Sequence, residues 1–306
     1  MEFADRLVEL QRAKKSVACL GVDPQLDTAS RRGLPDGHSL LSFCGEIVEA
    51  AAQFVVAIKP QLAFFEARGI EGMSAFREVV KLARRLDLVT IADAKRGDIG
   101  TTSAAYAEAF LGNGDFACDA VTINPYLGGD TIAPFVARVR TGRGVFVLVR
   151  NSNPSAAEFQ ELAVDGGMVW EKVAERVAGW GSDFVGKYGV SSVGAVVGAT
   201  YPAQAARARA LMPYALILVP GYGAQGAGAT EATASAQDST KPPGLLVSAS
   251  RSLMYAYLKN SGSSSGSSPG DAARLAARQM RDDLNRALEQ RGNNKQSEEY
   301  LRTRAS

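Results

Sequence analysis

The segment DAKRGDIG, residues 93–100, places two carboxylates beside one lysine. Lys95 lies between Asp93 and Asp98, and opposite charges on both sides favour the ammonium form of a lysine. An ammonium group can stabilise a developing negative charge and donate a proton, whereas a Schiff-base nucleophile must be a neutral amine. The simplest alternative is a solvated turn, since charge runs usually lie on the surface.

Two earlier apolar runs also end in a charged residue. Alternate residues of SVACLGVD lead to Asp23, and those of FVVAIK lead to Lys59. Because side chains two apart on a strand point the same way, these charges continue the inward-facing rows of their strands. The same pattern in LVTIADAK leads to Asp93 and Lys95. This recurrence predicts a charged cluster at the point where several strand ends meet.

Short apolar runs alternate with segments of helical periodicity along most of the chain. We expect strands at residues 16–22, 54–59, 86–93, 117–123, 144–150, 190–198, 215–220 and 244–248. Alternating strands and helices favour a parallel sheet, and eight strands is the number that closes a barrel. The sequence therefore predicts an α/β protein with a single (β/α)8 TIM barrel, and a doubly wound open sheet is the alternative.

Further segments flank or interrupt this alternation. Residues 1–15 form an extra N-terminal helix in our prediction, and residues 271–290 form an amphipathic C-terminal helix. We assign residues 1–290 to the barrel domain and residues 291–306 to a polar, frayed tail. Residues 221–243 and 261–269 are rich in small residues, and we expect a long functional loop and a flexible linker there.

Composition limits the classes of function. The 306 residues carry a formal net charge of +2, with basic and acidic residues mixed, so we expect no nucleic-acid partner. Cys19, Cys44 and Cys118 are widely spaced, which argues against a disulfide framework or a zinc site. The N-terminus lacks the apolar core of a signal peptide, and no apolar run is long enough to span a membrane. These features predict a cytoplasmic protein that does not contact membranes.

Several segments together resemble one family. GVDP (21–24), IKPQLAFFE (58–66) and DAKRGDIGTT (93–102) are similar to the signature segments of the orotidine 5'-monophosphate decarboxylases, in their longer bacterial and protozoal form. Further matches follow in order: INPYLGGD (123–130), VLVRNSNPSA (147–156), VGAT (197–200), VPGYGAQG (219–226) and VSASR (247–251). The resemblance implies a cofactor-free, metal-free decarboxylation of orotidine 5'-monophosphate (OMP) to uridine 5'-monophosphate (UMP), the last step of de novo pyrimidine synthesis.

The resemblance also implies a catalytic set. Lys59, Asp93, Lys95 and Asp98 correspond to the family's network of alternating charges. Asp93 would lie near the substrate carboxylate, and Lys95 would stabilise the carbanion at ring carbon C6 and then protonate it. Asp98 would reach the active site of a neighbouring subunit, as would Thr102, so the resemblance implies a homodimer with shared sites.

The remaining substrate contacts follow from the same comparison. Asp23 and Lys59 would bind the ribose hydroxyls, Ser152 the pyrimidine ring, and Pro220 would line the pocket. Gln225 would grip the phosphate. Arg251 would bind the phosphate as well. It follows the last predicted strand, where barrel enzymes often bind phosphate. Without the family match, a surface arginine would be the favoured interpretation.

Three positions depart from the family's usual residues. Gln61, Asn151 and Ser250 stand where members often have Asn, Thr and Gly. The first two departures concern secondary ligand contacts, and the third leaves Arg251 in place.

Other functions remain open from the sequence. A hexulose-phosphate synthase or keto-gulonate-phosphate decarboxylase shares the D-x-K-x-x-D core, but usually carries an acidic metal ligand near the second strand, where this chain has Lys59. A class I aldolase would use Lys59 or Lys95 in a Schiff base. A non-catalytic nucleotide sensor is disfavoured, because unpaired buried charges are costly to retain.

Overall fold

The computed structural model describes residues 1–25, 33–223, 227–238, 240–260 and 268–305. Within these residues eight parallel strands close into a barrel in the order β1-β10-β9-β8-β5-β4-β3-β2. The strands are β1 (Ala18–Val22), β2 (Ala57–Pro60), β3 (Val89–Arg96), β4 (Ala120–Ile123), β5 (Gly144–Arg150), β8 (Ser191–Val197), β9 (Ala215–Pro220) and β10 (Leu245–Ala249). Because β1 pairs with both β2 and β10, the predicted barrel is confirmed and the open sheet is excluded.

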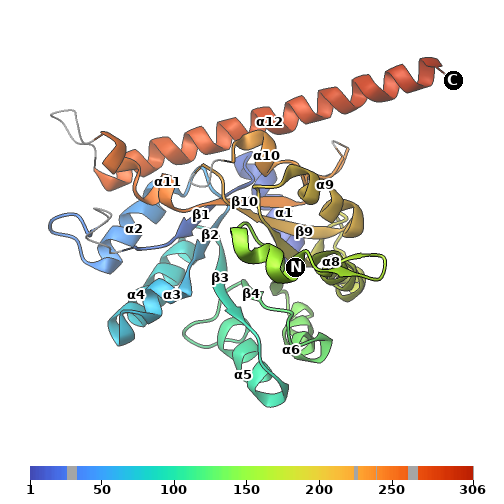
Figure 1. The fold of residues 1–306 in the computed structure, drawn as a ribbon. Coiled ribbons are helices and arrows are strands. Elements are labelled where there is room, and N and C mark those ends of the chain that lie inside the picture. The colour runs from blue at the N-terminus through green and yellow to red at the C-terminus, as the bar shows by residue number, and fades with distance from the viewer. Residues whose placement is uncertain (26–32, 224–226, 239, 261–267, 306) are drawn as a thin grey trace.

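Helices surround the barrel, as Figure 1 shows. They are α1 (Phe3–Lys14), α2 (Leu40–Ala51), α3 (Leu62–Glu66), α4 (Gly69–Arg85), α5 (Gly100–Leu111), α6 (Gly129–Val139), α7 (Ala157–Gln160), α8 (Val169–Gly181), α9 (Pro202–Leu211), α10 (Ala229–Ala232), α11 (Arg251–Met254) and α12 (Pro269–Ala305). Short 3-10 turns are η1 (Pro154–Ala156), η2 (Ser182–Phe184) and η3 (Ala256–Asn260). None of the helices among the described residues is long and apolar enough to cross a bilayer.

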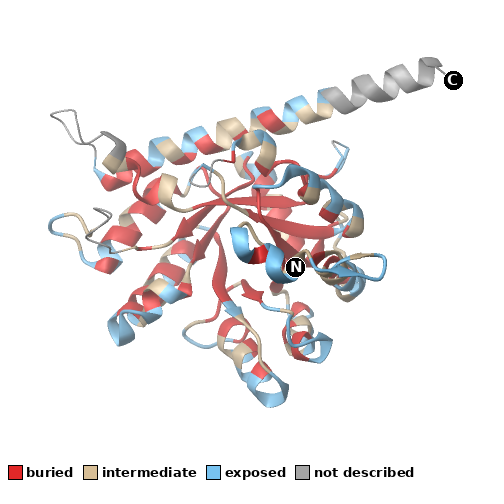
Figure 2. Cartoon of the chain, viewed as in Figure 1, coloured by how far each residue is buried: buried red, intermediate tan, exposed pale blue. Residues whose placement is uncertain are grey.

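The strands are buried on both faces (Figure 2), as expected for a parallel barrel covered by helices. Cys19, Ala57 and Ile91 belong to the inner apolar cluster, which confirms the alternation predicted for the first three strands. Val17 and Val55 were expected in the same inward rows, but they precede their strands and pack in the outer cluster beneath the helices.

The predicted N-terminal helix, α1, packs its apolar face into the inner cluster of the barrel. The Phe3 ring meets the Phe146 ring edge-on, with centroids 6.0 Å apart. The Gln11 side chain donates a 2.8 Å hydrogen bond to the carbonyl of Leu245, at the start of β10. Helix α1 therefore closes the amino end of the barrel and leaves the carboxyl ends of the strands for a site.

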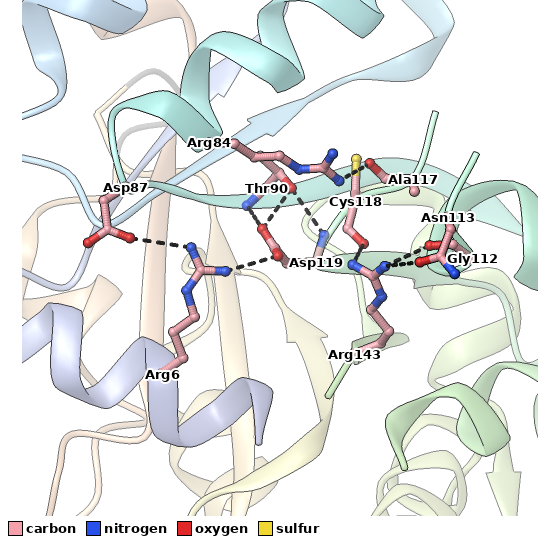
Figure 3. Close-up of polar contacts among 10 residues, drawn as sticks. All are labelled: Arg6, Arg84, Asp87, Thr90, Gly112, Asn113, Ala117, Cys118, Asp119 and Arg143. Atoms are coloured by element: carbon pink, nitrogen blue, oxygen red, sulfur yellow. Dashed lines mark hydrogen bonds and ion pairs between the residues drawn. The ribbon is translucent and has the colours of Figure 1, made fainter. Parts of the chain in front are cut away.

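A polar cluster at the same end ties β3 to β4 (Figure 3). Asp119, just before β4, accepts hydrogen bonds of 2.8 Å from both the backbone and the hydroxyl of Thr90 on β3. Arg6 of α1 pairs with the same carboxylate at 3.0 Å. These contacts fix the register of β4 against β3, the strand that carries the predicted site residues Asp93 and Lys95.

Within the region predicted as a long loop, residues 221–243, the described residues 227–238 contain more regular structure than the composition indicates. They include α10 and a buried stretch, residues 232–237, of mostly small side chains. The Arg209 guanidinium donates to the carbonyls of Ser235 and Gly244 at 2.8 and 2.7 Å. Small side chains let this backbone pack closely against the rest of the protein. The lack of apolar periodicity therefore did not reveal that residues 232–237 are buried.

Two other expectations changed at the level of elements. Helix α12 runs to Ala305, beyond the predicted end at residue 290, because residues 291–305 lack proline and contain several good helix formers. The two-stranded hairpin of β6 (Ala163–Val164) and β7 (Gly167–Met168) was not predicted. Most of the predicted Ser-rich linker, residues 261–267, lies outside the described residues.

Gly194 on β8 provides a test of barrel packing. A β-carbon there would lie 2.3 Å from the Leu216 carbonyl oxygen and 3.0 Å from the Phe146 ring. We expect Gly194→Ala to lower the free energy of unfolding by about 1–3 kcal/mol, as overpacking does. Urea denaturation followed by circular dichroism measures this change.

Gly179→Ala in α8 is the matched control, because nothing lies within 4 Å of its β-carbon position. It should stabilise the protein by about 0.5–1 kcal/mol through helix propensity. Equal effects of the two substitutions would contradict the packing argument.

Candidate active site

A cavity of about 390 Å³ opens at the carboxyl ends of the strands. Its volume falls in the range of roughly 300–1,000 Å³ that is typical of small-molecule sites. The predicted residues Asp23, Lys59, Asp93, Lys95, Ser152, Pro220 and Arg251 all line it, together with Gln61, Thr122, Asn151 and Ser250. Hollows of about 590 and 740 Å³ exist elsewhere among the described residues, but neither receives the ends of so many strands.

The Asp93 carboxylate is the centre of this cavity's hydrogen bonding. Its Oδ2 accepts from Lys59 Nζ at 2.5 Å and from Gln61 Nε2 at 3.1 Å. Its Oδ1 accepts from Lys95 Nζ at 2.5 Å and from the Thr122 hydroxyl at 3.0 Å. One buried carboxylate therefore orients two ammonium groups that come from different strands.

Charge pairing outweighs burial at this carboxylate. Burial alone would raise the pKa of Asp93, but the ammonium groups of Lys59 and Lys95 hold that pKa well below its ordinary value. Burial alone would lower the pKa of Lys59, but the carboxylates of Asp93 and Asp23 raise it above the usual value for lysine. The pair is thus fully charged at neutral pH.

Lys95 reaches this position through an irregular backbone. The pairing of β3 with β4 shifts register between Ala92 and Arg96, and Lys95 adopts a left-handed φ of 49°. A non-glycine residue rarely adopts that conformation, and bulges next to active sites commonly redirect a side chain. The Lys95 amide donates to the Thr122 hydroxyl at 3.0 Å, which supports the bulge. Plain strand alternation had not anticipated this kink.

Asp23 presents an acceptor to the cavity. Its Oδ1 is buried and has no hydrogen-bond partner among the described residues. Burial raises the pKa of Asp23, although the Lys59 ammonium and a hydrogen bond from Ser250 oppose the rise. A bound hydroxyl group would satisfy this oxygen, because an orphaned buried acceptor costs free energy.

Ser152 follows a buried arginine that fixes the backbone before it. Arg150 donates to the Asn151 carbonyl at 2.7 Å and pairs with Glu161 at 2.5 Å. The Gln160 side chain accepts from the Asn151 amide at 2.9 Å. The backbone N–H and C=O of Asn151 are therefore both hydrogen-bonded, which fixes the backbone that leads to Ser152 in the cavity.

The end of the cavity near β9 and β10 contains Pro220, Gly221 and Arg251. Arg251 begins α11 directly after β10, so its guanidinium supplies positive charge at this end. Gln225, the other predicted phosphate residue, lies outside the described residues.

Two predicted site residues do not reach the cavity of their own chain. Asp98 accepts a 2.8 Å hydrogen bond from the amide of Ile99, and Thr102 is exposed in the first turn of α5. Neither residue lines the cavity. Their contribution to any site remains a prediction that requires a second subunit.

Thr122 was missed by sequence reasoning, and the contact of Gln61 with Asp93 was not anticipated. Alternation could have found Thr122, since Ala120 on the same face of β4 belongs to the inner cluster. Gln61 follows the end of β2, where strand patterning gives no direction for a side chain.

Comparisons with known proteins agree with the resemblance seen in the sequence. Residues 20–258 match the family model described as orotidine 5'-phosphate decarboxylase / HUMPS family. The orotidine 5'-phosphate decarboxylase of Deinococcus radiodurans is 42% identical over 288 residues, which cover 94% of this chain and 98% of the relative. That of Rhodopirellula baltica is 39% identical over 301 residues, covering 93% and 99%. The structure of Leishmania donovani OMP decarboxylase superposes with a TM-score of 0.71 at 32% identity, covering 94% and 99%.

The ionisation of Asp93 provides a test of the site's electrostatics. We expect Lys59→Met to raise the titration midpoint of the Asp93 carboxyl, because an opposing charge is lost while burial remains. Carboxyl ¹³C NMR measures the midpoint, and the spectrum of Asp93→Asn assigns the resonance.

Because the pKa of Asp93 is lower in the folded protein than in the unfolded chain, ionisation of this carboxyl stabilises the fold. The carboxylate stabilises the fold fully above the ordinary aspartate value of about 3.9 and loses this contribution as the pH falls toward its folded-state value. The dependence should be weaker in Lys59→Met. The same titration midpoint of Asp93 in the wild type and in Lys59→Met would show that Lys59 does not lower the pKa of Asp93.

Proposed function

The chain belongs to the orotidine 5'-phosphate decarboxylase family, and we propose that it converts OMP to UMP and carbon dioxide as the last step of de novo pyrimidine synthesis. The observation that carries this proposal is the Lys59–Asp93–Lys95 arrangement inside the cavity. It provides one negative and two positive charges in fixed geometry, which suits a reaction in which charge moves from a carboxylate onto a carbon atom.

The proposed reaction breaks one bond and forms one. The bond between C6 of the pyrimidine and its carboxylate breaks, carbon dioxide leaves, and the electron pair stays on C6. The Lys95 ammonium stabilises this carbanion and then gives its proton to C6, which yields UMP. Lys95 is reprotonated from the solvent before the next turnover, so the net reaction takes up one proton, releases one carbon dioxide and needs no other reagent.

Preorganisation explains why this arrangement would accelerate the reaction. Asp93 already holds both ammonium groups at 2.5 Å before substrate arrives. Dipoles and charges fixed in advance stabilise a transition state without the cost of reorienting solvent. The Asp93 carboxylate would also lie near the carboxylate of the substrate, and the repulsion between these two negative charges would end when neutral carbon dioxide forms.

The rest of the cavity suits a nucleotide. Asp23 Oδ1, which has no hydrogen-bond partner in the described part of the chain, would bind the ribose hydroxyls together with Lys59. Ser152 would contact the pyrimidine ring, with Pro220 beside it. Arg251 would bind the phosphate through its two-pronged guanidinium, and by the resemblance Gln225 would assist it.

We propose that the active enzyme is a homodimer with shared sites. Asp98 and Thr102 do not line the cavity of their own chain and lie on the loop and helix after β3. Ile99 between them is 63% exposed, and Tyr126 and Leu127 after β4 are also exposed. A second subunit over these apolar residues would bury them and would receive Asp98 and Thr102 in its own site. We place the reaction in the cytoplasm, which agrees with three free, buried cysteines.

The contacts among Lys59, Asp93 and Lys95 disfavour the alternative functions that the sequence left open. A divalent cation at Asp93 would have to displace two ammonium groups, which disfavours a magnesium-dependent phosphosugar enzyme. A Schiff base at Lys59 needs a neutral amine, whereas the neighbouring carboxylates raise the pKa of Lys59. A nucleotide sensor would have no use for the proton donor.

The first test is turnover of OMP by the purified protein in EDTA, followed by the ultraviolet absorbance change. We expect activity without added metal, and Lys95→Ala should lower kcat by at least a thousandfold because both carbanion stabilisation and protonation are lost. Circular dichroism checks that the variant folds. Absence of wild-type turnover, or substantial activity in the folded variant, would contradict the proposed function or the role of Lys95.

A second test concerns sharing of sites between subunits. Mixing Lys95→Ala with Asp98→Ala should restore activity, because a mixed dimer places both substitutions in one site and leaves the other intact. Random exchange of subunits would restore about a quarter of wild-type activity.

Mixing Lys95→Ala with Lys59→Ala is the control for the shared site. Lys59 and Lys95 both line the cavity of their own chain, so each substitution disables the site of the subunit that carries it and every site of a mixed dimer stays defective. No restoration with Asp98→Ala would indicate that each site is complete within one chain.

A further inference from the structure

The turn that follows β9 is fastened to the C-terminal helix by one tyrosine. Tyr222 lies between Gly221 and Gly223, whose φ angles are 108° and 77°. The Tyr222 hydroxyl donates a 3.1 Å hydrogen bond to Oδ2 of Asp283 on α12. Tyr222 also lines both the active-site cavity and the hollow of about 590 Å³ beside α12. The residue is therefore in contact with both spaces.

Asp283 is itself held in place along α12. Its Oδ1 accepts from Gln279 Nε2 at 2.8 Å, one turn earlier, and from the Arg286 guanidinium, one turn later. These contacts leave Oδ2 for the tyrosine. Burial and the neighbouring Asp283 carboxylate raise the pKa of Tyr222 to about 12, so its hydroxyl remains a donor over the physiological range.

The other side of the turn packs against α11. A β-carbon on Gly223 would lie 3.3 Å from the hydroxyl of Ser252, the residue after Arg251. The Gly223 amide donates a hydrogen bond to the Ala227 carbonyl at 2.9 Å. Figure 1 shows α10 and α11 beside α12. The turn is thus wedged between α12 and the short helix that begins with Arg251.

We propose that Tyr222 and Asp283 are positioning residues for the phosphate end of the site. Their hydrogen bond fixes the turn of residues 220–223 against α12, and this sets the distance between the turn and Arg251. Neither side chain needs to touch the substrate. The inference rests on the proposed function, because it assigns the phosphate of a nucleotide to this end of the cavity.

The test compares UMP with uridine, which differ only in the phosphate. Isothermal titration calorimetry on the full chain measures both affinities for wild type, Tyr222→Phe, Asp283→Ala and the double variant. We expect each single substitution to weaken UMP binding about three- to tenfold. This is less than the roughly tenfold or larger loss of a direct hydrogen bond to a charged group, because the pair acts on the phosphate indirectly. Uridine affinity should stay unchanged, and the double variant should lose no more than either single variant.

Kinetics provide an independent readout of the same role. The KM for OMP should rise by a similar factor while kcat changes less than about twofold, because the chemistry at Asp93 and Lys95 is untouched. Tyr188→Phe is the matched control. Its hydroxyl also donates to a carboxylate, Glu9 Oε1 at 3.3 Å, but on α1 at the opposite end of the barrel.

The outcomes are distinct. Unchanged UMP affinity in Tyr222→Phe, equal losses for UMP and uridine, or additive losses in the double variant would overturn the proposal. A wild-type protein that binds UMP but does not turn over OMP would instead contradict the proposed function, and the affinity comparison would still decide the positioning role.

Discussion

The pairing of one buried carboxylate with two ammonium groups is the interaction on which the site depends. An isolated charge in the barrel interior would cost far more than the fold's net stability could tolerate. Asp93 is tolerated because Lys59 and Lys95 neutralise it, and Lys59 because Asp93 and Asp23 neutralise it. The same ion pairs that make these charges compatible with folding also orient them. The contacts that stabilise the fold therefore also preorganise the site for catalysis.

Asp93, the centre of this arrangement, lies on β3, which is held against β4 at two points. Thr90 and Asp119 bind each other at the amino end, and Asp93 and Thr122 bind each other three residues further along each strand. The register between these points cannot slip without breaking both contacts. The bulge that turns Lys95 toward Asp93 lies just beyond the second contact, and a local deviation is tolerated where its surroundings are so well determined.

The two ends of the cavity are built differently. The charged residues come from strands β2 and β3, which are buried except for Lys95 and Arg96 at the end of β3. The phosphate end in our proposal comes from a turn after β9 and from α11, which rest on α12. Groups that must be held within a fraction of an ångström are therefore on the sheet, whereas groups that bind the far end of a ligand are on connecting segments.

The sequence by itself determined the barrel, its inward rows and the positions of the strand-end charges, because strand periodicity and short-range order are local properties. It also identified the family, since the motif residues occur in order along the chain. It did not determine the bulge at Lys95, the contacts of Thr122 and Gln61 with Asp93, the packing of residues 232–237 or the bond between Tyr222 and Asp283. Those features join segments between 27 and 61 positions apart or depend on close packing of small side chains. Only the closed tertiary structure brings such groups within hydrogen-bond distance, because periodicity records which face a side chain occupies and not which distant residue meets it there.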